Sequence, residues 1–325
     1  MNVSPSAAAT GISPAHLKLL ACPVTGEPLR QEGGFLIGGS GRCRYSVHPS
    51  GIPLFAQEHL SEEAVIQRAH YDRVSEDYLA NLCYPHTEEY CGYLDRVLLE
   101  VARGATLGTV AEICCGRGEV FGLLGGRVGS GVGIDISLEM LKSARARHSD
   151  PRFLFVHGDA VSLPLAADSF DSVFMLGGIH HVNDRGRLFS EVRRVLKPGG
   201  RLFWREPVSD FFLWRWLRAV IYRVSDHLDS GTERPLRRAE TVSALEAAGL
   251  AVRAWKTCGF VGFCLFMNSD VLVFNRLFRF VPGIRAITRA AARLDDWAVR
   301  LPGLSGAGLQ VIGCAEKPPE RPVDR

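Results

Sequence analysis

The sequence lacks the charge excess that would assign it to a specialised class of protein. Its 38 Lys and Arg residues face 35 Asp and Glu residues, which leaves a formal net charge of +3. This balance gives no reason to expect a nucleic-acid partner. With 46% hydrophobic and 22% charged residues, the 325-residue chain has the composition of an ordinary globular protein with a full core.

Long apolar runs and paired cysteines are also lacking. The most apolar window, residues 258–275, is interrupted by Asn268, Ser269 and Asp270, whereas a membrane-spanning helix needs about 20 predominantly apolar residues. The nine cysteines are scattered and odd in number, which suits reduced thiols better than a disulfide framework. No basic segment followed by an apolar run suggests a secretory signal. We therefore expect a cytoplasmic protein.

Changes in composition along the sequence predict how the chain is divided into domains. Residues 1–13 are small and uncharged and predict a loose tail. Residues 14–56 are punctuated by glycine and proline and predict a small β-rich module. Residues 57–318 predict the main domain, with a helical insert at about 260–305 and a tail at 319–325.

Strands and helices alternate through the main domain. Apolar strands are expected at 109–114 and 131–134, and Ser137 is a plausible N-cap for the next helix. The later expected elements are strands at 152–159 and 172–177, a helix at 184–196 stopped by "KPGG", a strand at 201–207, helices at 209–225 and 238–249, a strand at 251–257, a helical stretch around 267–298 and a last strand at 309–315. This order predicts an α/β fold with a doubly wound, Rossmann-like sheet, mostly parallel with an antiparallel last strand, whose ligands bind at the strands' carboxyl ends.

A glycine loop and an acid follow the first two strands of that sheet. Gly116 and Gly118 let the backbone approach a ligand closely, because no Cβ intervenes. Phe121 stands where a dinucleotide fingerprint would have a further glycine. Asp135 can accept hydrogen bonds from ribose hydroxyls, which is a feature of dinucleotide sites and of other adenosine sites alike.

Four motifs in order remove that ambiguity: "EICCGRG", "GIDIS", "HGDAVSLPLAADSFDSVFMLGGIHHV" and "RVLKPGGRLFWREP". Over roughly residues 60–260 the chain resembles the class I S-adenosylmethionine-dependent methyltransferases, in particular those that act on small molecules. The resemblance implies S-adenosyl-L-methionine as cofactor, methyl transfer as the reaction and no metal.

The resemblance also implies roles for single residues around the cofactor. Glu112 takes the acid position near the methionine ammonium, reached through a water. Gly116 and Gly118 match the later glycines of the first motif, whereas Cys114 replaces the first glycine. Asp135, followed by Ile136, matches the acid that binds the ribose.

Two further parts of the cofactor site come from the same resemblance. Asp159 matches the residue that holds the adenine amino group, with the Ala160 amide beside it. Tyr78, with Tyr71 as the weaker candidate, lies on a leading helix that would fold over the cofactor. Both tyrosines can instead pack on the sheet.

The adjacent cysteines Cys114 and Cys115 are expected on a strand. Neighbouring side chains on a strand point to opposite faces, so the two thiols would not ligate one metal comfortably. No further cysteine or histidine completes a site nearby. We predict that the pair forms pocket wall or core.

The candidate catalytic residues follow the later strands. His180 and His181 lie just beyond the strand that ends against the transferring methyl group, and either can be the base that an oxygen or carbon acceptor requires. The alternative is that the pair shapes the loop and caps the next helix. Glu206 can orient an acceptor, or it can be a structural carboxylate that pairs with Arg205 or a helix end. Residues 84–90 are a plausible lid, and His86 is expected to be a surface histidine.

The N-terminal module resembles a small zinc ribbon that some methyltransferases carry or bind. Cys22 keeps one ligand of the first pair, Thr25 stands in place of its partner, and Cys43 is the one cysteine of the second region. Four ligands are needed for a closed zinc site, and the spacing of His16 and His48 does not supply them. We predict a zinc-free module.

Apolar segments of the sequence indicate the kind of acceptor and the kind of partner to expect. The expected helix at 209–225 carries Arg215, Arg218 and Arg223 among apolar residues, which favours packing on the sheet, a lid over an apolar acceptor or an interfacial face over an RNA track. We predict methyl transfer to an oxygen or carbon of a small, apolar acceptor such as a quinone, a lipid or a secondary metabolite. We also consider two kinds of association. One is contact with a membrane surface through residues 209–224 or 260–283, and the other is a homodimer. The alternatives are an RNA or protein methyltransferase and a non-catalytic binding subunit.

Overall fold

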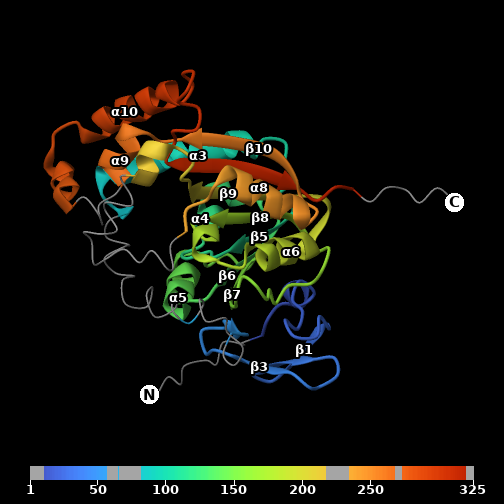
Figure 1. Cartoon of the computed structure of the whole chain (residues 1–325). Helices are drawn as coiled ribbons and strands as arrows, with labels where there is room; N and C mark the ends of the chain where they lie inside the picture. Colours follow the sequence, from blue (N-terminus) through green and yellow to red (C-terminus); the bar gives the residue numbers. More distant parts are fainter. Residues whose placement is uncertain (1–10, 57–64, 66–81, 217–233, 268–272, 320–325) are drawn as a thin grey trace, which may run out of the picture.

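A single mixed β-sheet organises the chain (Figure 1). The computed structural model describes residues 11–56, 65, 82–216, 234–267 and 273–319. In spatial order the strands run β1-β2-β3-β4-β7-β6-β5-β8-β9-β11-β10. Their bounds are β1 (Leu29–Glu32), β2 (Phe35–Gly38), β3 (Arg44–Val47), β4 (Pro53–Leu54), β5 (Thr109–Ile113), β6 (Ser130–Asp135), β7 (Phe153–His157), β8 (Phe170–Leu176), β9 (Leu196–Pro207), β10 (Ala251–Cys258) and β11 (Gln310–Glu316).

The expected topology of the main sheet is confirmed. Strands β7, β6, β5, β8 and β9 are parallel, and β11 pairs antiparallel with both β9 and β10. Parallel strands place their carboxyl ends at one edge, so the residues that follow them gather there. One boundary differs from the prediction: β9 begins at Leu196, because "KPGG" continues from the helix directly into the strand, with Gly199 donating to the Lys317 carbonyl at 2.8 Å.

Most helices form where the pattern predicts them, but the pattern does not predict α3 (Pro85–Val101), and residues 84–90, which were considered as a lid, form its N-cap and first turns. Ser137 caps α5 by accepting from the Met140 amide, and Asp184 caps α6 through the Arg187 amide. The helix bounds are α1 (Pro14–Leu17), α3 (Pro85–Val101), α4 (Glu119–Leu124), α5 (Leu138–Arg147), α6 (Arg185–Val195), α8 (Arg238–Ala247), α9 (Val261–Met267) and α10 (Ile284–Ala298), with 3-10 helices η1 (Gly125–Arg127), η2 (Ile179–His181) and η3 (Val273–Phe280). Tyr71 and Tyr78 of the expected leading helix, and residues 217–225 of the expected helix at 209–225, lie outside the described residues.

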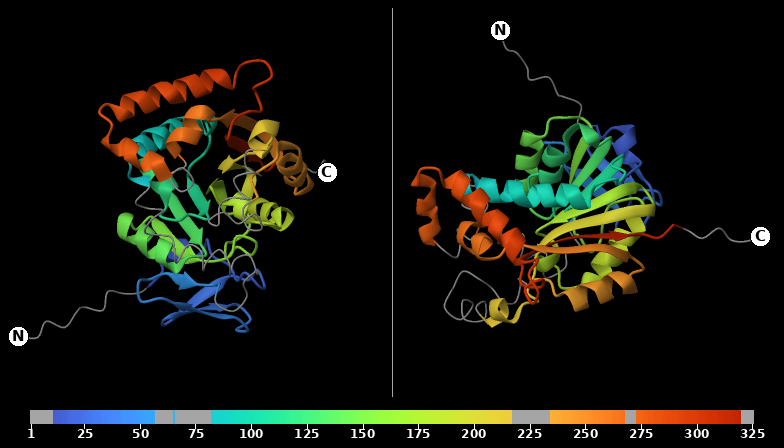
Figure 2. Two further views of the ribbon diagram at one scale, coloured as in Figure 1. Left: turned by 60° about the vertical axis from the view of Figure 1, so that its left-hand side comes forward. Right: turned by 90° about the horizontal axis from the view of Figure 1, so that it is seen from above.

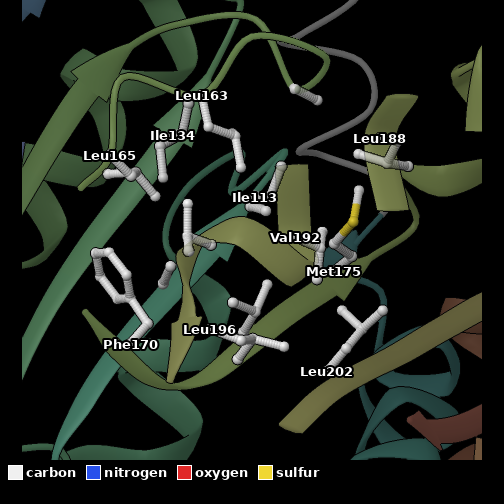
Figure 3. Packing of buried hydrophobic residues seen from close by; sticks show 14 of the residues in the cluster. Ile113, Ile134, Leu163, Leu165, Phe170, Met175, Leu188, Val192, Leu196 and Leu202 are labelled. Atoms are coloured by element: carbon white, nitrogen blue, oxygen red, sulfur yellow. The ribbon is translucent and has the colours of Figure 1, made fainter. Parts of the chain in front are cut away.

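Two apolar clusters cover the two faces of the sheet. One packs α6 and α8 on the sheet through residues such as Leu188 and Leu245, and Figure 3 shows Ile113, Met175 and Leu202 within it. The other packs α3, α4 and α5 on the opposite face. Alternation along β9 therefore sends Phe203 to the α3 side and Trp204 to the α6 side, and this alternation fixes where the polar residues at the strand end point.

The N-terminal module extends the same sheet. Strand β4 pairs with β7 at Leu54 and His157, and His16 Nε2 donates to the Arg152 carbonyl at 3.0 Å. The structure thus joins residues 14–56 to the edge of the main sheet, at the lower end of the molecule in Figure 1. Within the described ranges, no helix combines the length and the apolarity that crossing a membrane requires.

The C-terminal insert forms as expected between the last two strands. Elements α9, η3 and α10 separate β10 from β11 and lie at the end of the molecule away from the module (Figures 1 and 2). Asp295 holds the insert together: it is buried and accepts hydrogen bonds from the Tyr90 hydroxyl at 2.6 Å and from the amides of Phe260, Gly262 and Phe263. A carboxylate with this many donors fixes α10 against α3 and α9.

Candidate active site

The predicted polar residues converge on the carboxyl edge of the parallel strands. Glu112 lies in β5, Asp135 ends β6, Asp159 follows β7, and Glu206 lies near the end of β9. His180 lies in η2, directly after β8. The topology brings together residues that are up to 94 positions apart in the chain.

Asp135 ties the glycine loop to the end of β6. Its Oδ2 accepts from the Gly116 amide at 2.8 Å, and its Oδ1 accepts from the Ser137 amide at 2.9 Å. Gly116 and Gly118 adopt φ values of +49° and +71°, a left-handed conformation that favours glycine. A Cβ on Gly118 would lie 3.0 Å from ring carbons of His148 and Phe155, so this residue needs to be glycine for space as well.

Glu112 is a buried carboxyl, and its two oxygens differ in their hydrogen bonding. Oε1 accepts from the Val120 amide at 3.1 Å, whereas Oε2 is buried and has no hydrogen-bond partner among the described residues. Burial raises the pKa of Glu112 well above its usual range, and the nearby carboxylates of Glu119 and Asp135 raise it further. An unpartnered buried oxygen of this kind fits a cationic ligand group, which would satisfy the oxygen and stabilise its ionised form.

Cys114 and Cys115 pack in or against the core as predicted, but they do not lie on a strand. The strand ends at Ile113, and Cys114 already lies beyond it with a φ of +54°, so the strand-alternation argument for the pair is wrong. A Cβ on Gly178 would lie 2.5 Å from the Cys114 Cβ, which places Cys114 against the β8–η2 turn. Cys115 points into the core toward Gly133. Burial raises the pKa of both thiols well above the usual value.

Asp159, Ala160 and Ile136 line the β6–β7 part of the edge. Asp159 and Ala160 are buried, and Asp159 Oδ1 accepts from the Val161 amide at 3.0 Å. The Ile136 carbonyl accepts from His157 Nε2 at 2.9 Å, which fixes the turn after β6. These contacts hold the backbone of the predicted adenine and ribose region in place.

Glu206 is the centre of the β8–η2 turn. Its carboxylate is fully buried and accepts from the amides of Gly178 at 2.7 Å and Ile179 at 2.8 Å. His180 contributes two more donors, its amide at 3.3 Å and its ring Nδ1 at 2.8 Å. Because the carboxylate accepts from Nδ1, the neutral ring keeps Nε2 as the nitrogen that can take a proton. The ring of His181 lies beside that of His180, with centroids 3.8 Å apart.

Arg205 precedes Glu206 in β9, and the sequence predicted no role for it other than as a partner of Glu206. It points to the other face of the sheet, where Nη1 donates to Asp95 Oδ1 at 2.6 Å and Nη2 lies 3.9 Å from Glu119. Burial acts against the charge of Arg205, but Asp95, Cys91 and Glu119 together outweigh it and raise the pKa of the guanidinium. Strand alternation could have placed Arg205 on the α3 side, but nothing local in the sequence points to Asp95.

The expectation for His86 is wrong. This histidine is fully buried near the start of α3, not on the surface, because α9 and η3 cover it with Phe266 and Phe278. Both of its ring nitrogens lack a hydrogen-bond partner among the described residues, and burial lowers the pKa of His86. The neutral ring therefore belongs to the apolar contact between α3 and the insert.

The cysteines of the N-terminal module lie near a tyrosine. Cys22 Sγ lies 3.0 Å from the Tyr45 hydroxyl. Of the other candidate ligands, His48 Nδ1 lies 2.7 Å from Ser50 Oγ. Across the described ranges, no group of three or more histidine, cysteine, aspartate or glutamate side chains is arranged to hold a metal ion. All nine cysteines of the chain are described, and none forms a disulfide.

Comparison with known proteins finds a family model that matches the centre of this site. Residues 111–204 match the model of a family described as a methyltransferase domain. This part of the chain is therefore similar to that domain. The matched residues run from β5 to β9, through the glycine loop, Asp135, Asp159 and η2.

Curated relatives resemble the same part of the chain. The chain is 39% identical over 102 residues to a chloroplastic 2-phytyl-1,4-beta-naphthoquinone methyltransferase of Arabidopsis thaliana, covering 29% of this chain and 39% of that protein. It is 35% identical over 100 residues to a demethylmenaquinone methyltransferase of Oceanobacillus iheyensis, covering 29% of this chain and 42% of that protein. The chain thus spans less than half the length of these two relatives.

A solved structure resembles the fold over a longer stretch. It is the complex between the Haloferax volcanii Trm112 methyltransferase activator and a putative methyltransferase. The match has a TM-score of 0.51 and 21% identity, and it covers 78% of this chain and 98% of that one. At this identity the likeness shows the fold alone.

Proposed function

We propose that the protein transfers a methyl group from S-adenosylmethionine to an oxygen or carbon atom of a small, apolar acceptor of the quinone type. The observation that carries the proposal is the His180–Glu206 pair, which presents an oriented base at the end of β8, beside the glycine loop of the methyltransferase domain. The two curated relatives are named for naphthoquinone and menaquinone substrates, which supports this class of acceptor.

The residues at the edge fit the proposed cofactor. When bound, S-adenosylmethionine supplies a methyl group that is already electrophilic. Asp135 would bind the ribose, and the Gly116–Gly118 loop would let the protein backbone come close to the cofactor. Asp159 and the Ala160 amide would bind the adenine. The unpartnered Oε2 of Glu112 fits the methionine ammonium.

On the acceptor side, His180 would remove a proton from a hydroxyl of the acceptor. A reduced naphthoquinone carries such hydroxyls, and their ionisation makes both oxygen and ring carbon more nucleophilic. Glu206 acts through His180 by fixing the ring and stabilising its protonated form. In this arrangement Glu206 positions the base and does not contact the acceptor. The ring of His181 lies beside that of His180.

An acceptor test separates this proposal from its alternatives. We expect the purified chain with methyl-labelled S-adenosylmethionine to label a prenylated 1,4-naphthoquinol at least tenfold faster than unmodified tRNA or a denatured protein substrate. The measurement is label transferred per minute, with the oxidised quinone as the matched control because it lacks the ionisable hydroxyl. Preferential labelling of tRNA would favour the RNA alternative. Binding of the cofactor without transfer to any acceptor would favour the non-catalytic alternative.

Because the carboxyl of Glu112 is buried, we expect cofactor binding to release a proton. Burial raises the pKa of this carboxyl, which favours its protonated form in the free protein, although the Val120 amide and Arg205 oppose the shift, and an ammonium beside Oε2 favours the ionised form. Binding therefore expels a proton, and affinity rises with pH until the free carboxyl is itself ionised. Calorimetry of S-adenosylmethionine binding in buffers of different ionisation enthalpy measures this release. We expect the Glu112→Gln variant to bind more weakly and to release none, and an unchanged release would contradict the assignment.

Other expectations stay predictions. They are the role of Tyr78 in covering the cofactor, the homodimer, the cytoplasmic location, the absence of a nucleic-acid partner, the zinc-free character of the N-terminal module and the boundaries of the domains.

A further inference from the structure

The C-terminal insert exposes most of the large apolar side chains that the described surface carries. Fourteen large hydrophobic residues of the described part of the chain are exposed, and nine of them lie in the insert, seven of these between Phe274 and Trp297. Four residues of this stretch are more than 60% exposed: Leu277, Phe280, Leu294 and Trp297. Contiguous exposed apolar side chains of this size mark an interaction surface.

Helix α10 has a second apolar stripe that faces away from the protein. Its buried residues include Ile284, Thr288 and Asp295, which pack against α3 and α9. Ile287, Leu294 and Trp297 are 47%, 65% and 61% exposed. At about 3.6 residues per turn, Ile287 and Leu294 lie nearly in line, about 100° around the helix from the buried residues, and Trp297 lies opposite the buried residues.

Helix η3 continues the apolar stripe toward the start of the insert. Phe274, Leu277 and Phe280 are spaced by three residues, and a 3-10 helix has about three residues per turn, so the three side chains share one face. Val281 follows at 39% exposure. Both helices lie at the end of the molecule away from the N-terminal module (Figure 2). Phe274, Leu277, Phe280, Val281, Ile287, Leu294 and Trp297 are called the insert face below.

Arginines accompany the insert face. Residues 273–300 contain six arginines and two aspartates, whereas the rest of the chain carries a net charge of −1. Asp295 is buried among backbone donors, and Asp296 pairs with Arg300. Arg285 and Arg289 pair with Glu88 and Glu89 on α3. The charge of the region remains positive even when these two glutamates are counted.

On α10 the arginines occupy the side between the buried stripe and the exposed stripe. Arg285, Arg289 and Arg293 are exposed and spaced by four residues, which keeps them on one side of the helix, and the exposed Arg300 follows just beyond its end. Long arginine side chains in this position can reach an anionic surface while the apolar stripe enters it. This is the pattern of a helix that lies in the plane of a membrane interface.

We propose that the insert face docks the protein onto the surface of an anionic lipid bilayer. The apolar side chains of η3 and α10 would enter the headgroup boundary, and the exposed arginines outside the ion pairs named above, Arg279 and Arg293, would contact lipid phosphates. The charge favours this occupant over a second copy of the chain, because a symmetric pairing of the insert face would bring two rows of arginines together. The docking is independent of the methyl-transfer proposal, since it is measured as binding to lipid and not as activity.

Vesicle binding tests the docking. We expect the full chain to co-sediment with vesicles of phosphatidylglycerol and phosphatidylcholine (1:1), at least tenfold more tightly than with pure phosphatidylcholine, and binding to weaken as NaCl is raised. The Leu277→Glu/Leu294→Glu double variant changes two exposed residues, so the fold is expected to be retained, and it should bind the anionic vesicles at least tenfold more weakly. Circular dichroism and unfolding by urea check the fold of each variant.

Two controls separate the insert face from other exposed apolar residues. Val24→Glu alters an exposed residue of the N-terminal module, and Phe212→Glu/Trp216→Glu alters the other segment considered for membrane contact. We expect both to bind like the wild type. Equal loss in either control, equal binding to both kinds of vesicle or no binding to either would overturn the proposal. So would a dimer in solution that the insert variant converts to a monomer.

Discussion

The His180→Asn variant is expected to turn over 10²- to 10⁴-fold more slowly than the wild type, about the contribution of a general base. Asparagine can donate from its side-chain amide to Glu206 in place of the ring Nδ1, which lies 2.8 Å from the carboxylate. It offers no basic nitrogen in place of Nε2. The variant therefore keeps the β8–η2 turn and loses the proposed base. Steady-state kinetics with the acceptor identified by labelling give the turnover number.

Cofactor affinity distinguishes a base from a residue that only shapes the turn. We expect S-adenosylmethionine to bind His180→Asn within about threefold of the wild type, because the Gly178 and Ile179 amides still bond to Glu206. His48→Asn, in the N-terminal module, is the matched control and should be fully active. Unchanged turnover in His180→Asn would mean that the histidine pair shapes the loop, as the alternative interpretation holds.

The sequence predicted the edge of the sheet well because the signals there are local. An apolar strand followed by glycines or a carboxylate is read from a few neighbouring residues, and parallel pairing then fixes which ends meet. Glu112, Asp135, Asp159 and Glu206 all lie at this edge for that reason. The same locality explains why Ser137 could be recognised as the cap of α5.

Features that depend on distant partners could not be predicted. His86 is buried by Phe266 and Phe278, which lie 180 or more residues further along the chain. Arg205 and Asp95, which form an ion pair, are 110 residues apart. The left-handed conformation of Cys114 is also unexpected, because non-glycine residues rarely adopt it and the residue type gives no signal. Only the close approach of Gly178 shows how the loop accommodates the thiol.

The Asp135→Ala variant is expected to bind S-adenosylmethionine about 10²-fold more weakly. The carboxylate accepts from the Gly116 and Ser137 amides, so its loss frees the glycine loop as well as removing the proposed ribose contacts. Two hydrogen bonds to a charged group, at about 1.5 kcal/mol each, correspond to roughly this factor. Calorimetric titration of the purified variant and wild type measures the ratio.

The control for Asp135→Ala is a carboxylate with similar local contacts outside the site. Asp150 accepts from the backbone amide and the guanidinium of Arg152, so Asp150→Ala removes comparable hydrogen bonds and should leave cofactor affinity within about twofold. NAD serves as the competing ligand, since the glycine loop and the acid alone would suit either cofactor. Binding of NAD by the wild type, or full affinity of Asp135→Ala for S-adenosylmethionine, would contradict the assignment of this edge. Loss in Asp135→Ala alone places the cofactor where β5 and β6 end.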